Sequence, residues 1–532
     1  MQREKNYANL NQIRQTVGEK SSGPERKGMM GEMVFEARVR RRVRALWLGL
    51  TLSAMVTQLG YAQDLQSYSA LNPGSSNLTG LPGQNVAQQM MAQSINNFCP
   101  TVASIAMPTA GQKALSGLCG AMIGNALQVL GQTPNPNLGT PFTLDANGLN
   151  NLLQQLNGGA ELLVPTSQAS VVQTTQTSRQ TGAIEERLKE LRDWTTGSTL
   201  AGAESPRLAQ VASLNTREPG DGPLLAQNQP LEFAYSTGPF GVFVSGLGQF
   251  GSRDQTTTET GYSFNNAGFI AGADYRFTPQ LIAGLAFGYT QSNTNFDTSA
   301  LSASGQSLNG NLLQGNLYAT YSVTDALYVN AIGFIGGGNN NSQRHIVLTQ
   351  PNASDLIGNG IATGSFGSRI AGFTLAGGYD LPYGAFVLTP IARFLYQHTG
   401  VDAFSEEGAL GADLAFGSSS VSTVLTFLGA DAQYTMPTPF GVLFPIARFH
   451  WAHQYSPSNT AVSVAYSNDS SSGLLSNFIL PGTPTSRNYF DLGVGVTLPF
   501  SSNGSAFINY DAILGINNTT YNSFTAGVRF TF

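Results

Sequence analysis

The C-terminal half of this chain alternates between apolar and polar residues up to its last position. In the final nine residues, apolar side chains at Phe524, Ala526, Val528, Phe530 and Phe532 alternate with polar or small residues. Successive side chains of a strand point to opposite faces, so this period of two predicts a strand with one apolar face. A single such strand could lie at the edge of any sheet. The pattern is decisive because the residues from 239 onward repeat it.

Turn-like clusters separate alternating segments along this half of the chain. The expected strands are Gly241–Phe250, Asn265–Phe277, Leu281–Gln291, Ser307–Val323, Ala326–Gly337, Gly367–Asp380, Ala385–Val401, Ser420–Met436, Gly441–Tyr455, Arg487–Pro499, Ser505–Gly515 and Tyr521–Phe532. That makes about twelve, and an even number is typical of bacterial single-chain membrane barrels. Long connections are expected at Asn339–Gly364 and Asn459–Pro484.

Composition favours a barrel in a membrane over a sheet in water. Charged residues are 11% of the chain, against about 25% in ordinary soluble proteins. Disordered chains carry few aromatics and high net charge, whereas this chain has 10% aromatics and a net charge of -5. A soluble β-sandwich is the alternative, but it would solvate its polar faces with many Lys and Glu. Strands of about ten residues that close into a cylinder can span a bilayer without exposing backbone polar groups.

The N-terminal segment reads as a secretory signal at residues 30–62. A basic region that ends at Arg44 precedes the apolar run Ala45–Val56, and Gly60-Tyr61-Ala62 supplies small residues before an expected cleavage at Gln63. The apolar run is too short for a membrane-spanning helix. A short basic amphipathic helix is the alternative. Residues 1–29 are expected to be a disordered or non-native extension.

Residues 63–180 are expected to form a short exported region with little core. Helices are expected at Gln88–Phe98, Lys113–Leu130 and Asp145–Leu163, with too few large apolar residues for a deep interior. Cys99 and Cys119 are the only cysteines. In an oxidising compartment they favour one disulfide, and two free buried thiols are the alternative.

Residues 181–235 contain a charged helix followed by a linker rich in Gly, Pro and Ser. In Gly182–Trp194, Ile184, Leu188 and Leu191 line one face, and Glu185 and Lys189 form a favourable pair one turn apart. Twelve strands about 4.8 Å apart and tilted near 40° give a backbone diameter of about 24 Å. Inward-facing side chains take up part of this diameter. The lumen that they leave has room for one helix, about 10–12 Å across, but not for a folded domain.

Several charged residues fall on the polar faces of the expected strands and are candidates to line the lumen. They are Asp274, Arg276, Arg393, Arg448, Asp511 and Arg529. We expect some of the arginines to pair with Glu185, Glu186 or Glu190 on the helix. The alternative is that they stay solvated, because exposed ion pairs contribute little.

Three stretches give the chain a resemblance to the type V autotransporters of Gram-negative outer membranes. They are Val401–Gly408, Phe507–Asp511 and the terminal strand Phe524–Phe532, and the charged helix precedes them in the family's order. The resemblance covers residues 236–532. It implies a mainly β fold, namely a 12-stranded antiparallel barrel, monomeric and in contact with outer-membrane lipid. The helices expected from the sequence pattern add a small helical N-terminal region.

The resemblance also implies how the parts act. The barrel-assembly machinery would recognise the terminal strand through Val528, Phe530 and Phe532, after export by the Sec translocon. A pore helix carrying Ile184, Glu185, Glu186, Arg187, Leu188 and Glu190 would join the barrel to a passenger. The short passenger departs from the family, whose passengers are mostly long β-helices. The resemblance would place self-cleavage of the chain in the pore helix, but the pairs Asn96-Asn97 and Asn150-Asn151 lie outside it. We therefore expect the passenger to remain attached.

No chemical motif points to an enzyme, a cofactor or a metal. Gly246–Gly251 fits a dinucleotide-binding pattern, but it lies in a strand and no helix follows. All four histidines lie in the barrel half, and His450 and His453 are three apart, on opposite faces of a strand. No basic stripe for nucleic acid occurs. The sequence therefore predicts an outer-membrane autotransporter that translocates or anchors a short passenger, at the cell surface or in the periplasm. The alternative is a porin-like or adhesin-like barrel with a periplasmic N-terminal region.

Overall fold

The computed structural model describes residues 78–133, 140–157, 174–195, 238–256, 260–297, 305–350, 353–439, 441–455, 461–469, 476–481, 486–501 and 503–532. All of them belong to one compact unit, Ser76–Phe532. The expected signal segment and the extension before it lie outside the described residues. No helix among the described residues has the length and apolarity needed to cross a membrane.

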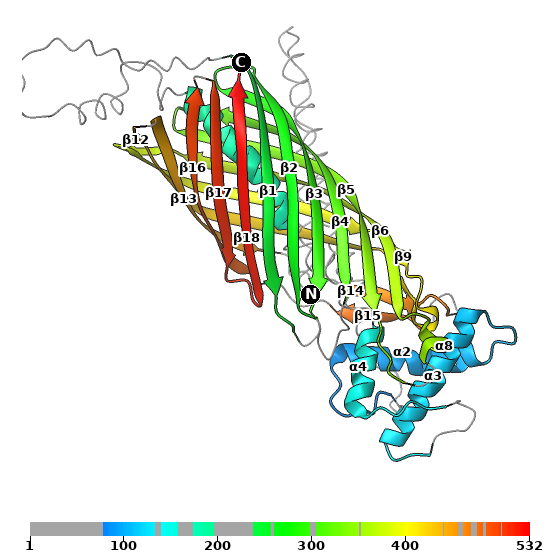
Figure 1. Ribbon diagram of the computed structural model, residues 1–532. Coiled ribbons are helices and arrows are strands. Elements are labelled where there is room, and N and C mark those ends of the chain that lie inside the picture. Colours follow the sequence, from blue (N-terminus) through cyan, green and yellow to red (C-terminus); the bar gives the residue numbers. More distant parts are fainter. Residues whose placement is uncertain are drawn as a thin grey trace, which may run out of the picture. The chain divides into compact units, whose positions relative to one another are not determined.

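Twelve long antiparallel strands form a closed barrel, which confirms the predicted fold class (Figure 1). They are β1 (Phe240–Arg253), β2 (Tyr262–Arg276), β3 (Leu281–Phe296), β4 (Ser307–Ser322), β5 (Leu327–His345), β6 (Ile361–Tyr379), β8 (Phe386–Val401), β11 (Ser419–Tyr434), β13 (Gly441–Gln454), β16 (Asn488–Ser501), β17 (Gly504–Leu514) and β18 (Thr519–Thr531). Strand β1 pairs with β18, and β8 pairs with both β6 and β11. The ladder therefore has no open edge.

The two ends of the barrel differ in how the strands are joined. At one end, which we call the turn end, β1 begins, β18 finishes and short hairpins join β2–β3, β4–β5, β6–β8, β11–β13 and β16–β17. The short strands β7 (Leu381–Tyr383) and β12 (Met436–Thr438) extend two of these hairpins. The opposite end, which we call the loop end, carries the longer connections.

Small elements of the loop-end connections make a second sheet. The strands β9 (Phe404–Ser405), β10 (Leu414–Phe416), β14 (Ala461–Tyr466) and β15 (Phe478–Pro481) pair in the order β15-β14-β10-β9. A short helix α8 (Ala353–Ile357) and a 3₁₀ turn η4 (Leu410–Ala412) lie in neighbouring connections. The expectation of a simple loop at Asn339–Gly364 is wrong at both ends, because β5 runs to His345 and β6 starts at Ile361. Gly and Asn are poor strand formers, but pairing with neighbouring strands overrides local propensity.

The helices are α2 (Val86–Ala103), α3 (Ala110–Val129), α4 (Ala146–Leu156) and α6 (Thr174–Thr195). Asn85 and Thr109 start α2 and α3 with capping boxes, and Asp145 caps α4. The expected third helix lies at the right place, but its described part finishes at Leu156. Helix α6 begins at Thr174, eight residues before the expected Gly182.

The expectation of a shallow helical region is wrong. Residues from α2, α3 and α4 share one buried core with the loop-end connections. The helix sequences alone give too shallow a core, because the loop-end connections contribute further buried side chains, such as Leu414, Phe416 and Val464. We call the helices and the connections packed on them the cap.

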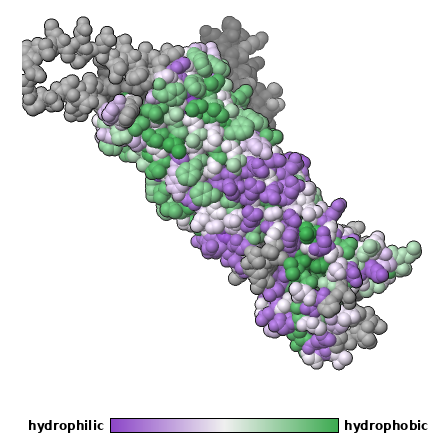
Figure 2. Space-filling view, in the orientation of Figure 1, coloured by the Kyte–Doolittle hydropathy of each residue, from purple (hydrophilic) through white to green (hydrophobic). Residues whose placement is uncertain are grey.

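The outer wall of the barrel exposes large apolar side chains, including Leu285, Leu317, Ile335, Val494 and Phe532. Figure 2 shows this as an area of hydrophobic surface over the strands near the turn end. Such a band fits the hydrocarbon of a bilayer.

Candidate functional site

One face of α6 packs against one side of the barrel wall. Ile184, Leu188 and Leu191 recur at helical spacing and lie on one face. Together with Ala183 they form a buried cluster with side chains of β1–β5, namely Phe243, Leu247, Ile270, Ile282, Ala286, Tyr318 and Ile332. Burying an aliphatic side chain of this kind contributes about 1.5–3 kcal/mol. This apolar contact fixes which side of the lumen the helix occupies.

Arg187 locks the helix to the same wall. Its Nε donates to Asp274 Oδ2 at 2.9 Å and its Nη2 to Asp274 Oδ1 at 3.1 Å, while Nη1 contacts Glu190 at 3.2 Å. The Arg187 side chain is fully buried. A bidentate arginine–carboxylate pair fixes geometry as well as charge, so it sets the height of the helix in the barrel.

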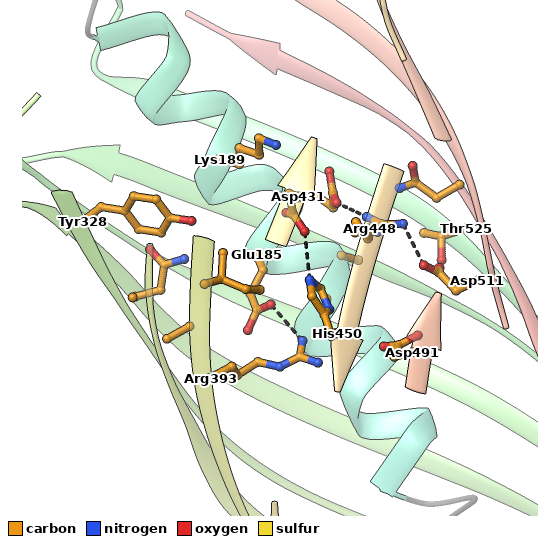
Figure 3. Close-up of a pocket in the computed structure, with 18 of the residues that line it drawn as sticks. Glu185, Lys189, Tyr328, Arg393, Asp431, Arg448, His450, Asp491, Asp511 and Thr525 are labelled. Carbon is orange, nitrogen blue, oxygen red and sulfur yellow. Dashed lines mark hydrogen bonds and ion pairs between the residues drawn. The ribbon is translucent and has the colours of Figure 1, made fainter. Parts of the chain in front are cut away.

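The opposite face of α6 meets charged groups of the far wall, as Figure 3 shows. Arg393 Nη1 donates to Glu185 Oε2 at 3.0 Å, and Arg448 Nη1 donates to Glu186. Arg448 Nη2 also reaches Asp511 Oδ1 at 2.8 Å. The helix is therefore held from both sides, by packing on one and by ion pairs on the other.

The C-terminal part of α6 lies at the turn end. Glu190 pairs with Arg529 at 3.3 Å and accepts a hydrogen bond from Ser505, and both of these residues lie beside the turn end of their strands. Arg276 Nη2 donates to the carbonyl of Leu191 at 3.4 Å. A cation at the last carbonyls of a helix also suits its dipole.

Two further contacts give the direction of the helix. The guanidinium of Arg192 lies 3.3 Å from the ring centroid of Tyr328, at the first turn-end residues of β5. Gln180 Nε2 donates to Thr290 Oγ1 at 2.9 Å, in the loop half of β3. The chain in α6 thus runs from the loop end towards the turn end.

The structure brings every wall residue proposed for the lumen into contact with α6 or with another member of the set. These residues are Asp274, Arg276, Arg393, Arg448, Asp511 and Arg529. Of the residues proposed for the helix, Ile184 and Leu188 face the apolar wall, and Glu185, Glu186, Arg187 and Glu190 make the ion pairs.

A cavity of about 80 Å³ remains between the polar face of α6 and the far wall. His450 and Asp431 line it and interact with each other at 2.9 Å between Nε2 and Oδ1 (Figure 3). This volume holds a few water molecules, not a second chain segment. Sequence reasoning missed this pair, although His450 is two residues from Arg448 and so shares its face of the strand.

The cap has a core built from two distant parts of the chain. Its helical residues include Met91, Phe98, Leu118, Met122, Leu149 and Leu153, and its barrel-connection residues include Ile346, Ile357, Leu414, Phe416, Val464, Tyr466 and Phe478. The rings of Phe98 and Tyr466 lie 4.9 Å apart. Because all these connections belong to the loop end, the helices α2–α4 pack at that end.

A buried arginine joins the helices to the connections. Arg344, at the loop end of β5, pairs with Glu406, and its Nη1 donates to the carbonyl of Gln155 in α4 at 3.0 Å. Its Nη2 also donates to the carbonyl of Ala412 at 2.8 Å. The same guanidinium therefore joins β5 to α4 and to the connection between β8 and β11.

Two more features of the cap concern its stability. Cys99 and Cys119 form the predicted disulfide between α2 and α3, with their Cα atoms 5.7 Å apart. Asp413 accepts a hydrogen bond from the N–H of Ala409 at 2.7 Å. Burial nevertheless raises the pKa of the Asp413 carboxyl to about 6, and the nearby Glu406 carboxylate acts in the same direction.

The sequence from residue 242 to residue 511 matches the family model described as "Autotransporter beta-domain". This match spans half of the chain and nearly the whole barrel. The chain belongs to the autotransporter β-domain family. Membership places the barrel in the outer membrane, with lipid around its apolar wall.

Solved autotransporter barrels resemble this autotransporter at low sequence identity. The translocator domain of NalP from Neisseria meningitidis has a TM-score of 0.43 at 13% identity, over 56% of this chain and 91% of that one. The β-domain of the Bordetella autotransporter BrkA gives 0.40 at 16% identity, over 55% and 100%. The transport unit of AIDA-I from Escherichia coli gives 0.37 at 15%, over 61% and 98%. No curated protein matches this autotransporter.

The last strand of this autotransporter closes the barrel against its first. Phe532 N–H donates to the carbonyl of Phe240 at 2.7 Å, and Phe240 N–H donates back at 3.3 Å. Val528, Phe530 and Phe532 alternate with the buried Arg529 and Thr531, so they lie on the outward face of β18.

Proposed function

We propose that this barrel carries the residues before α6 across the outer membrane and then keeps them on the cell surface as the folded cap. The residues carried would be 63–173, the part of the expected passenger that precedes α6, with α6 left in the lumen as the pore helix. The Sec translocon would deliver the chain to the periplasm. The barrel-assembly machinery would insert the barrel as a monomer, with Val528, Phe530 and Phe532 as the recognition pattern.

The observation that carries the proposal is the path of the chain. The helices α2–α4 pack on the loop-end connections, α6 runs from the loop end to the turn end, and β1 then starts at the turn end. Barrels of the outer membrane turn tightly on the periplasmic side and carry longer connections outside. A chain that follows this path enters the barrel from the outside and leaves it in the periplasm.

The dimensions of the lumen support transport before folding. The cavity between α6 and the far wall has a volume of about 80 Å³. The folded cap cannot pass such a space, so its helices cross as an unfolded chain and fold outside. Burial of the apolar residues of the cap then opposes return, because each large side chain buried contributes about 1.5–3 kcal/mol.

Labelling of single cysteines in intact cells tests the proposal. Met107 lies between α2 and α3 and its side chain is 91% exposed. A membrane-impermeant maleimide should label Met107→Cys in intact cells. Gln280→Cys, exposed at the turn end, is the matched control and should react only after the outer membrane is permeabilised.

The rival functions predict a different labelling pattern. A porin-like or adhesin-like barrel with a periplasmic N-terminal region would leave Met107→Cys unlabelled until permeabilisation. Labelling of Gln280→Cys but not Met107→Cys in intact cells would reverse the proposed orientation. Either result contradicts export of the cap.

A further inference from the structure

The outward face of β2–β5 changes character at one level of the barrel. Near the turn end it exposes apolar side chains such as Leu285, Leu317 and Val329. Towards the loop end the same face carries carboxamides, which we call the amide grid: Asn265, Gln291, Asn293, Asn295, Asn309, Asn311, Asn339, Asn341 and Gln343. Figure 2 shows a hydrophilic area on the flank of the barrel next to the hydrophobic one.

The strand register arranges the amide grid in rows. Asn265 lies opposite Asn293, Asn293 opposite Asn309, Asn309 opposite Asn341, and Asn341 opposite Ser365 of β6. Neighbours across the sheet are therefore about 4.8 Å apart, and rows two residues apart along a strand are separated by about 7 Å. The result is a surface of closely spaced groups that can each donate and accept hydrogen bonds.

A second row includes Asn311 and Asn339, which meet at an irregularity in the pairing of β4 and β5. The backbone N–H of Asn339 donates to Asn311 Oδ1 at 3.1 Å. Most other amide groups of the grid face outwards and are exposed or half-buried. Ser365, which donates to Asn341 Oδ1 at 2.7 Å, caps the row at its β6 side.

Hydration alone does not explain why these strand positions carry Asn. Asn is among the residues most depleted from strands, whereas Thr fits a strand well and hydrates equally. The positions of the amide grid carry no charge, and at its β6 edge Arg369 and Asp402 pair with each other at 3.2 Å. A surface of this kind suits neutral hydroxyl groups better than phosphate, because it carries no charge of its own and the arginine at its edge is paired with a carboxylate.

We propose that the amide grid binds the neutral sugars of the glycolipid that surrounds the barrel in the outer leaflet. The amide grid continues outwards from the lipid-facing wall of the same strands over several rows, so it lies beside the sugars that extend beyond the lipid anchor. Sugar hydroxyls donate and accept hydrogen bonds at a spacing on the scale of one ring, as the carboxamides do. The bound glycolipid would hold β2–β5 at a fixed depth in the membrane. This inference rests on the outer-membrane location and on the orientation proposed above.

Binding of the purified full-length protein in detergent to two lipid probes tests the inference. The probes are lipopolysaccharide with its complete sugar chain and its lipid A portion without core sugars. The variant Asn293→Thr/Asn309→Thr/Asn341→Thr keeps polarity and strand propensity but removes the central row of amides. The matched control, Asn488→Thr/Asn517→Thr, changes the same residue type at the same end on the opposite wall.

The expected result is a roughly tenfold or larger rise in Kd of the triple variant for the complete lipopolysaccharide, from three lost amide contacts. The control variant should bind like the wild type, and all three proteins should bind lipid A alike. Unchanged affinity of the triple variant overturns the inference, as does equal affinity of the wild type for both probes. The triple variant could also lose the gel mobility of a heat-resistant folded barrel while it keeps its affinity. That result would show that the amides only stabilise the sheet, and it also overturns the inference. Labelling of Met107→Cys remains a separate test of orientation.

Discussion

Arg187 of the lumen helix and Asp274 of the barrel wall form a bidentate ion pair in which both side chains are buried. Each is an expensive group to bury alone, and together they hold α6 at one height in the lumen. The apolar wall beside them and the ion pairs on the far side place the helix between two unlike surfaces.

Removal of one partner of this pair should destabilise the protein strongly. Asp274→Ala leaves the Arg187 charge buried with only Glu190 near it, and we expect a loss of about 3–5 kcal/mol. Arg187→Leu/Asp274→Leu should cost less than the sum of the single changes, because no charge is left unpaired. Thermal unfolding followed by gel mobility in detergent measures both.

The exposed pair Arg369–Asp402 is the control for that experiment. Arg369→Ala should change stability by less than about 1 kcal/mol, because solvent screens exposed pairs. Equal losses at the two pairs would contradict the role given to burial.

The ion pairs on the far wall should keep the lumen closed to ions. Arg393→Glu/Arg448→Glu places carboxylates against Glu185 and Glu186, so repulsion replaces two attractions. We expect larger and more frequent conductance steps in planar bilayers than with wild-type protein. Conductance identical to wild type would show that these contacts do not seal the pore.

Asp413 should make the stability of the cap depend on pH. Its pKa is raised to about 6 in the folded cap, against about 3.9 for an unperturbed aspartate, so the folded form retains the proton longer. The cap is then most stable below pH 4, and it loses up to about 3 kcal/mol as pH rises to 6. Asp413→Asn should remove this slope and match the wild type only at low pH. Limited proteolysis of the cap at pH 4 and pH 7 measures the difference.

The disulfide should stabilise the cap independently of the barrel. Cys99 and Cys119 are 20 residues apart, and closing a loop of that length contributes about 3 kcal/mol. Cys99→Ala/Cys119→Ala should leave barrel closure unchanged while α2 and α3 become sensitive to protease. Faster cleavage of barrel strands in the variant would show that the disulfide also stabilises the barrel, which contradicts this prediction.

The barrel could be predicted well from the sequence because each strand shows its own apolar and polar alternation. Alternation assigns each strand residue to the lipid or to the lumen, so Arg393, Arg448 and Arg529 could be assigned to the polar side of their strands without a structure. The chain could not reveal the shared core of the cap, because Phe98 and Tyr466 are brought together only by tertiary packing. The pair His450–Asp431 was missed for the same reason, since the strand register decides which polar residues face each other. The start of α6 at Thr174 was missed because its polar first turns lack an apolar stripe.

The central claim is that the chain enters the barrel at the loop end and runs through it to the turn end. A crosslink made in cells tests it most directly. Gln180→Cys/Thr290→Cys joins positions whose side chains lie 2.9 Å apart, whereas Gln180→Cys/Ser505→Cys would meet only if α6 ran the other way. Cysteine is shorter than glutamine, so a short bifunctional thiol reagent is used in place of oxidation. We expect it to crosslink the first pair and not the second. Crosslinking of the second pair without the first would contradict the claim.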